Sequence, residues 1–144
     1  MKRKVFLAFI ALNVFVGVIA QTTPSTLTML TGKVWDYLLF DDGEKKIRIE
    51  FYYSTTEERV QCFSDVWNTT ETSKFYLSDS IVNVFDDSKI GKINNGKYII
   101  LKDVFEDGHI EVSCQEIIEL TDTTLTIRDI EGDDYSDAIT LFRK

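Results

Sequence analysis

The 144-residue sequence contains a single histidine, two cysteines, one proline and seven glycines, so it is poor in the imidazole and thiol groups that many catalytic and metal sites use. A lone histidine has no second imidazole with which to share a metal ion, and a catalytic histidine needs a neighbouring nucleophile and an orienting acid. We therefore interpret His109, which follows Gly108 in an expected turn, as an exposed turn residue. No catalytic motif, metal site or cofactor is predicted, so the chain is not expected to be an enzyme.

Basic residues are also scarce, with 16 lysines and arginines against 24 aspartates and glutamates and a formal charge of −8. Nucleic acids and anionic membrane surfaces are bound through clusters of Lys and Arg, so neither is an expected partner. The acidic run from Asp129 to Asp137 could offer oxygen ligands to calcium, but its spacing departs from that of an EF-hand loop. We interpret this run as a solvated loop.

Long apolar runs are absent except near the start, where Val5–Ile19 is apolar at all but one position. Basic residues at 2–4 precede this run and the small residue Ala20 ends it, which predicts a signal peptide over residues 1–20. The run is too short to favour a membrane anchor. The sequence therefore predicts export to the periplasm or the extracellular space, with no stable membrane insertion after cleavage. Loss of the three basic residues would change the formal charge from −8 to −11.

Cleavage of 20 residues would leave 124 of the 144, which is enough for one domain with a sizeable core. Residues 21–29 are rich in Thr and Ser and contain the only proline, which predicts a flexible lead-in. The domain itself is predicted to span residues 30–144, and we expect it to be a monomer.

Strand patterns recur about every ten residues and no segment keeps a helical period, which predicts an all-β fold. The first strand falls within Leu30–Gly43 and ends in an Asp-Asp-Gly turn. The clearest alternation follows at residues 46–53. Further strands are expected at residues 59–64, 74–77, 81–85, 98–102, 110–120, 125–127 and 138–143, with a polar loop at 65–73. Eight to nine strands joined by short turns predict an antiparallel meander that closes into a small barrel and so removes its exposed edges.

Short stretches at both ends of this domain resemble lipocalins. Leu30-Thr31-Gly32-Lys33-Val34-Trp35 resembles their Gly-x-Trp strand, with two residues instead of one between Gly and Trp. Ile118–Ile127 and Thr140–Arg143 resemble the closing strands of small lipocalin-like domains in exported bacterial proteins. The resemblance implies a lipocalin-like barrel with Arg143 stacked on Trp35 at its floor, an arrangement that a cation–π contact would stabilise. It also implies a small apolar ligand in the interior.

The inward phase of the expected strands supplies the ligand-binding residues Phe51, Tyr53, Phe75 and Glu116. If the strand at 110–120 keeps its register, Glu116 faces inward and burial raises its pKa, whereas a bulge would turn it to water. Large inward side chains could instead fill a barrel of eight strands. The alternative function is therefore a packed barrel that binds a protein or a carbohydrate through its loops.

Both cysteines fall on the inward phase of their expected strands, and export would allow a Cys62–Cys114 disulfide. The two positions are 52 residues apart, and closing a loop of that size would stabilise the fold by about 4 kcal/mol in the chain-entropy model. If the two Cα atoms lie more than about 7 Å apart, no bridge can form without backbone movement. Two buried free thiols are then the alternative.

Overall fold

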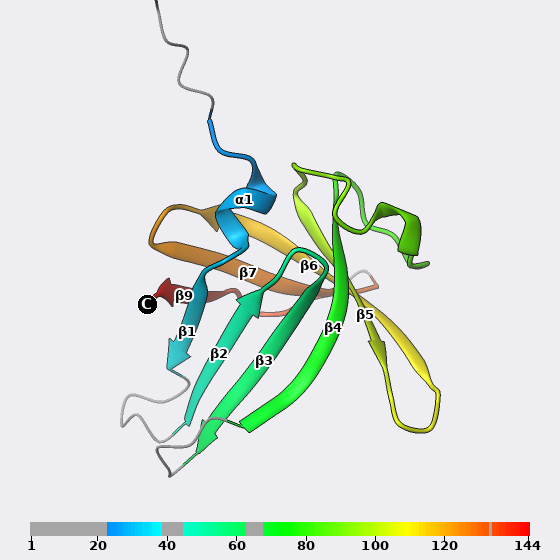
Figure 1. Ribbon diagram of the computed structural model, residues 1–144, viewed down its shortest axis with the longest axis horizontal. Coiled ribbons are helices and arrows are strands. Elements are labelled where there is room, and N and C mark those ends of the chain that lie inside the picture. The colour runs from blue at the N-terminus through cyan, green and yellow to red at the C-terminus, as the bar shows by residue number, and fades with distance from the viewer. Residues whose placement is uncertain (1–22, 39–44, 63–67, 133) are drawn as a thin grey trace, which may run out of the picture.

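The structure is a computed structural model that describes residues 23–38, 45–62, 68–132 and 134–144. The predicted signal peptide and the predicted Asp42-Gly43 turn lie outside these residues. Nine strands form one antiparallel sheet in the described part of the chain (Figure 1). They are β1 (Val34–Leu38), β2 (Lys45–Phe51), β3 (Thr55–Cys62), β4 (Asn68–Ser78), β5 (Tyr98–Val104), β6 (Ile110–Leu120), β7 (Thr124–Glu131), β8 (Asp134–Tyr135) and β9 (Ile139–Arg143).

The sheet closes into a barrel of eight strands. Neighbouring strands follow chain order from β1 to β6, then β6 pairs with β7, β7 with β9, and β9 with β1. The closing pair sets Trp35 directly opposite Arg143. Among the described residues, the ninth strand, β8, pairs with the end of β7 alone and extends from the barrel. The predicted all-β antiparallel meander that closes into a small barrel is therefore confirmed.

Three predicted segments differ in type from the structure. Strand β4 begins at Asn68, so most of the polar loop predicted at 65–73 is a strand, because its threonines are β-branched and suit extended backbone. The strand predicted at 81–85 is instead part of a long connection between β4 and β5 that contains the 3₁₀ helix η1 (Asp87–Lys89). The acidic run from Asp129 is not only a loop, since it forms the end of β7 and all of β8.

A short helix, α1 (Thr26–Leu30), covers one end of the barrel, within the segment predicted to be a lead-in (Figure 1). The Ser25 hydroxyl accepts a hydrogen bond from the Thr28 amide and caps this helix. Leu27 and Leu30 are buried against the barrel core, and the Trp35 indole donates to the Leu30 carbonyl at 3.3 Å. No helix among the described residues is long and apolar enough to cross a membrane.

The inner core fills the barrel beneath α1. Its largest members include Phe51 and Phe75, whose rings meet edge to face with centroids 5.6 Å apart. The other buried members come from most of the strands around the barrel and from α1. They are Leu27, Leu30, Trp35, Leu77, Ile99, Leu101, Leu125, Ile127 and Leu141. This end of the barrel is packed with side chains, as the sequence allowed for a barrel of eight strands.

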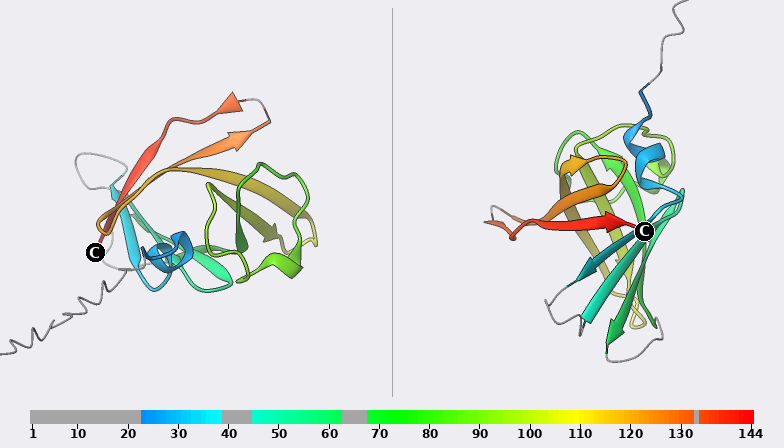
Figure 2. Two further views of the ribbon diagram at one scale, coloured as in Figure 1. Left: turned by 90° about the horizontal axis from the view of Figure 1, so that it is seen from above. Right: turned by 90° about the vertical axis from the view of Figure 1, so that its left-hand side faces the viewer.

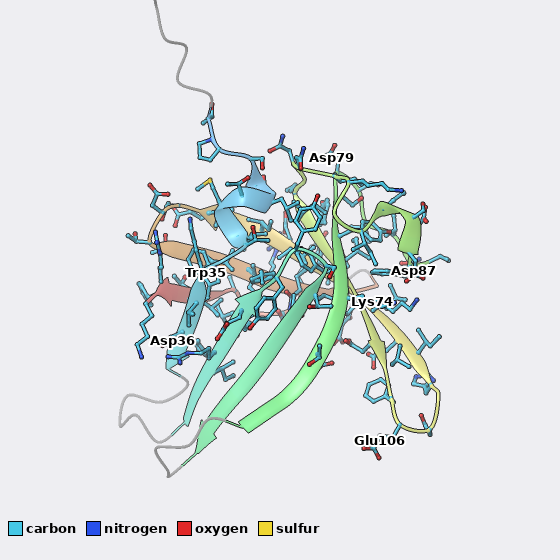
Figure 3. All side chains as sticks on the ribbon, viewed as in Figure 1. Trp35, Asp36, Lys74, Asp79, Asp87 and Glu106 are labelled. Atoms are coloured by element: carbon cyan, nitrogen blue, oxygen red, sulfur yellow. The ribbon has the colours of Figure 1, made fainter. Side chains whose placement is uncertain are left out.

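A second, smaller core lies outside the barrel wall. The connection at residues 79–97 folds over the outer face of β4, β5 and β6 and buries Tyr76, Ile100, Cys114 and Ile130. Asp87 links this connection to the wall, because its carboxylate meets Lys102 at 2.6 Å and Lys74 at 3.5 Å (Figure 3). The wall is thus buried on both faces here. That is why the chain is continuously apolar at residues 75–77 and 99–101, where a one-sided strand would alternate.

Strands β6 and β7 separate along part of their length. Their pairing begins at Cys114 and Ile130, and just beyond it β7 turns at Gly132, whose φ of +64° suits glycine, into β8. Among the described residues, Ile110–Ser113 therefore pairs with β5 alone. Figure 2 shows the β7–β8 end diverging from the rest of the barrel wall. We call this opening the seam.

Candidate functional site: an acidic mouth and the seam beside it

The half of the barrel away from α1 contains an open cavity of about 300 Å³, which we call the mouth. Its apolar side is the edge of the inner core, formed by Ile49, Phe51 and Leu101. The rest of the lining is polar and includes four carboxylates. These polar residues are Thr56, Glu71, Ser73, Asp103, Glu111, Ser113, Gln115 and Asp129.

Strand alternation places these carboxylates inside the barrel. Leu101 faces the inner core, so Asp103, two residues further along β5, faces the same way. The register sets Asp103 opposite Glu111 on β6, and sets Gln115 opposite Asp129 on β7. The interior therefore changes along the strand direction from apolar to acidic. Of the four carboxylates, only Asp129 stands out in the sequence, as the start of the acidic run, because only the register between strands brings all four to one surface.

Among the described residues, Asp103 Oδ1 is a buried carboxylate oxygen without a hydrogen-bond partner. In contrast, Asp129 Oδ1 accepts a hydrogen bond from Gln115 Nε2 at 2.9 Å. No lysine or arginine lines this cavity in the described part of the chain. A buried carboxylate oxygen is stabilised by an N–H donor or a positive charge, so the mouth is chemically suited to a cationic group. No set of three or more acidic, histidine or cysteine side chains among the described residues could hold a metal ion.

Of the predicted ligand-binding aromatics, Phe51 lines the mouth and Phe75 is buried behind it in the inner core. Tyr53 is not inside the barrel: it is 64% exposed, and its hydroxyl donates to the Gly91 carbonyl. The predicted inward position of Tyr53 is wrong because β2 ends at Phe51, so the alternation that began at Ile47 stops two residues earlier than expected.

Glu116 also lies elsewhere than predicted. Its side chain lies on the outer face of β6, where the residue is 6% exposed and meets Lys97 Nζ at 2.7 Å and Arg128 Nη2 at 2.5 Å. The hydrogen bond from Lys97 lowers the pKa of Glu116, burial opposes this, and Arg128 lowers it further. The predicted inward position and raised pKa are therefore wrong. The inward phase of β6 is carried by Ser113 and Gln115 instead.

The wrong phase for β6 has a physical cause. Cys114 is buried and Val112 is partly buried, but both face the connection at residues 79–97 and not the barrel interior. An apolar outer face covered by a loop has the same alternation in sequence as an inner face, so periodicity alone cannot separate the two.

The predicted Cys62–Cys114 disulfide is not formed. Cys114 is a free, buried thiol in the outer core, and burial raises its pKa to about 11. The strand that carries Cys62, β3, is separated from β6 by β4 and β5, so the two backbones are not neighbours. The side chain of Cys62 lies outside the described residues.

Trp35 and Arg143 meet through their strands but do not stack as the resemblance implied. The cation recorded over the indole is Lys33, with Nζ 6.0 Å from the ring centroid. Arg143 is exposed and donates to the Asp122 carbonyl at 3.4 Å. Figure 3 places Trp35 below α1, at the packed end of the barrel. His109 is exposed in the β5–β6 hairpin, where its ring stacks on Phe105.

Comparison of the chain with protein-family models, with curated proteins and with solved structures finds no match in any of the three. The resemblance to lipocalins therefore stays a prediction, and a functional proposal rests on the geometry of the mouth.

Proposed function

We propose that the protein is a non-catalytic binding module whose barrel mouth receives a positively charged group. The observation that carries this proposal is Asp103, which lines the cavity and whose Oδ1 is buried without a hydrogen-bond partner among the described residues. Glu111 and Asp129 line the same cavity and add to its negative potential. An ammonium or guanidinium group would supply both the charge and the N–H donors that these oxygens accept.

The lining also favours a ligand with a short apolar part beside its charge. Ile49, Phe51 and Leu101 form one side of the cavity, and the carboxylates form the others. A wholly apolar ligand, as the resemblance implied, would shield the carboxylates from water without offering them a donor, which is costly. A volume of about 300 Å³ is at the small end of ligand pockets, so it suits one side chain or a small amine. The predicted signal peptide supports assigning this module to an exported protein.

A pair of isosteric probes tests the charge requirement. We expect 4-phenylbutylammonium to bind and to shift the amide resonances of Leu101 and Ser113, while the neutral 4-phenylbutanol binds much more weakly. Asp103→Asn should lower the affinity for the amine about tenfold, which corresponds to about 1.4 kcal/mol.

The matched control is Glu106→Gln. It removes the same charge from the tip of the β5–β6 hairpin, away from the mouth (Figure 3), and should leave the affinity unchanged. Equal affinities for the amine and the alcohol, or an Asp103→Asn variant that binds the amine as the parent does, would refute the proposal.

A further inference from the structure

A second cavity lies on the outer side of the seam. This groove of about 390 Å³ runs between the start of the connection at residues 79–97 and the diverging end of β7. Its apolar lining comes from Ile81, Val82, Val112, Cys114 and Ile130, and its other residues are Asn83, Glu111, Ser113, Asp129, Glu131 and Gly132. Glu111, Ser113 and Asp129 also line the mouth, so the two cavities meet at the seam.

The backbone of β6 is unpaired at the seam. In an antiparallel ladder, the N–H and C=O groups of successive residues point to opposite sides of the strand. The Ile117 amide donates to the Lys97 carbonyl at 2.8 Å, and the Phe105 amide donates to the His109 carbonyl at 2.9 Å. Odd-numbered residues of this hairpin thus direct their backbone groups toward the partner strand of the hairpin. The backbone groups of Ile110 and Val112 consequently point away from β5, toward the seam, where the described residues provide no partner strand.

The side chains at this edge alternate between polar ones that face the mouth and apolar ones that face the outer groove. Glu111 and Ser113 line the acidic mouth on the inner side. Val112 contributes to the apolar groove on the outer side, and Ile110, on the same face of β6, is 53% exposed. Ile81 borders the same groove and is 42% exposed. A strand laid along this edge would therefore direct every second side chain to carboxylates and the others to apolar surface.

We propose that an extended peptide segment with alternating cationic and apolar side chains adds as a strand to the Ile110–Ser113 edge of β6. Its lysines or arginines enter the mouth, and its apolar side chains cover the outer groove. This inference rests on the proposed function, because the cation received by the mouth is a side chain of the peptide. Charge complementarity selects the partner: neither cavity is lined by a lysine or arginine among the described residues, and the whole chain carries a formal charge of −8. Strand addition then supplies the backbone hydrogen bonds.

The peptide Ac-Val-Lys-Val-Lys-Val-NH₂ tests this arrangement, with binding followed by the amide resonances of Ile110–Ser113. Two doubly N-methylated forms, one methylated at the amides of both lysines and the other at the amides of the first two valines, form a matched pair of equal composition. Only one alternate set of amides faces β6 in a paired strand, so one form should lose at least about tenfold in affinity and the other should change less than about twofold.

A variant of the protein provides the complementary test. Val112→Pro removes an N–H that points to the seam and leaves the ladder to β5 intact, so it should abolish peptide binding while the binding of 4-phenylbutylammonium is retained. Val104→Pro is the control, because Val104 lies opposite Ile110 in the same hairpin but directs its N–H away from the seam. Thermal melts of both variants establish that they are folded.

Two results would overturn strand addition: equal binding of the two N-methylated forms, or unchanged peptide binding by a folded Val112→Pro variant. If the amine still binds in that case, the proposed function stands and only the peptide inference fails. If neither the amine nor the peptide binds the parent protein, both proposals fail.

Discussion

Glu116 is held on the outer face of β6 between Lys97 and Arg128. Its pKa lies below the ordinary value of 4.5 because of the hydrogen bond from Lys97, against which burial acts, and the contacts with Arg128. A pKa lowered by folding means that the group stabilises the fold above its unfolded pKa, and that this contribution is lost as the pH falls through the folded pKa.

Replacing the Glu116 carboxylate tests whether its ionised form stabilises the fold. We expect Glu116→Gln to lower the free energy of unfolding at pH 7 by about 1 to 2 kcal/mol, a modest figure because both cations remain partly exposed. The difference from the parent should shrink toward pH 3, where the parent carboxyl is itself becoming protonated. Urea denaturation at the two pH values measures this, with exposed Glu119→Gln on the same strand as the control. A side-chain titration giving a pKa above 4.5 would contradict the assignment.

The thiol of Cys114 should be inert in the folded protein. Burial raises its pKa to about 11 from 9.0, so in a Cys62→Ser background iodoacetamide at pH 8 should leave it unmodified until denaturant is added. Because its folded pKa is raised, its contribution to stability is complete below pH 9 and declines between about pH 9 and pH 11, by about 2 to 3 kcal/mol.

The comparison for Cys114 is Cys114→Val, which keeps an apolar side chain in the outer core and cannot ionise. Urea midpoints of the two proteins should converge or cross as the pH rises above 9. A parallel decline would assign the effect to other groups, among them Tyr76, whose pKa is also raised by burial.

At the scale of elements, α1 acts as a plug for the packed end of the barrel. Leu30 is fully buried against the inner core, while Thr28 on the same short helix is exposed. We expect Leu30→Ala to lower the free energy of unfolding by about 2 to 5 kcal/mol, as for other large-to-small changes in a core. Thr28→Ala should cost less than about 0.5 kcal/mol. Equal effects would show that the helix does not seal the barrel.

Strands with one buried face were predictable from the sequence, whereas the orientation of a strand whose outer face is covered by a loop was not. The alternation of Ile47, Ile49 and Phe51 correctly identified β2 as a strand with an inward apolar face. Strand β6 was also identified, but its faces were exchanged because a loop covers the outer one. The carboxylates Asp103 and Glu111 are eight positions apart, and they become neighbours only through the hairpin register that no local pattern specifies.

At the scale of the whole molecule, the barrel has a packed half and an open half, and hydrogen exchange should distinguish them. Amides of Ile99 and Leu101 belong to fully paired strands beside the core and should exchange most slowly. Along β6 we expect the amides of Glu111 and Ser113, which point to β5, to be protected, while those of Ile110 and Val112 exchange quickly. Uniform protection of these four amides would mean that the seam is closed in solution.

The closure of the barrel was predictable from strand count and short turns, whereas the mouth was not. Eight strands can meet edge to edge, and Trp35 opposite Arg143 shows that the first and last do so. Strands β6 and β7 separate near Gly132, where the chain turns from β7 into β8. The opening of the acidic interior therefore coincides with this turn, and the sequence around a turn does not specify which strand will lie beside it.

The two cores on opposite faces of the wall have a thermodynamic consequence. Substitutions at Leu77, in the inner core, and at Phe85, beside the outer core, fall in two clusters that share Ile93 alone among the described residues. Their effects on the free energy of unfolding should therefore add, within about 0.5 kcal/mol, in a double-mutant cycle. A double-mutant cycle that combines Ile93→Ala with a substitution in either core should depart from additivity. The inner and outer cores would then contribute almost independently to the free energy of unfolding, and Ile93 would be the side chain that couples them.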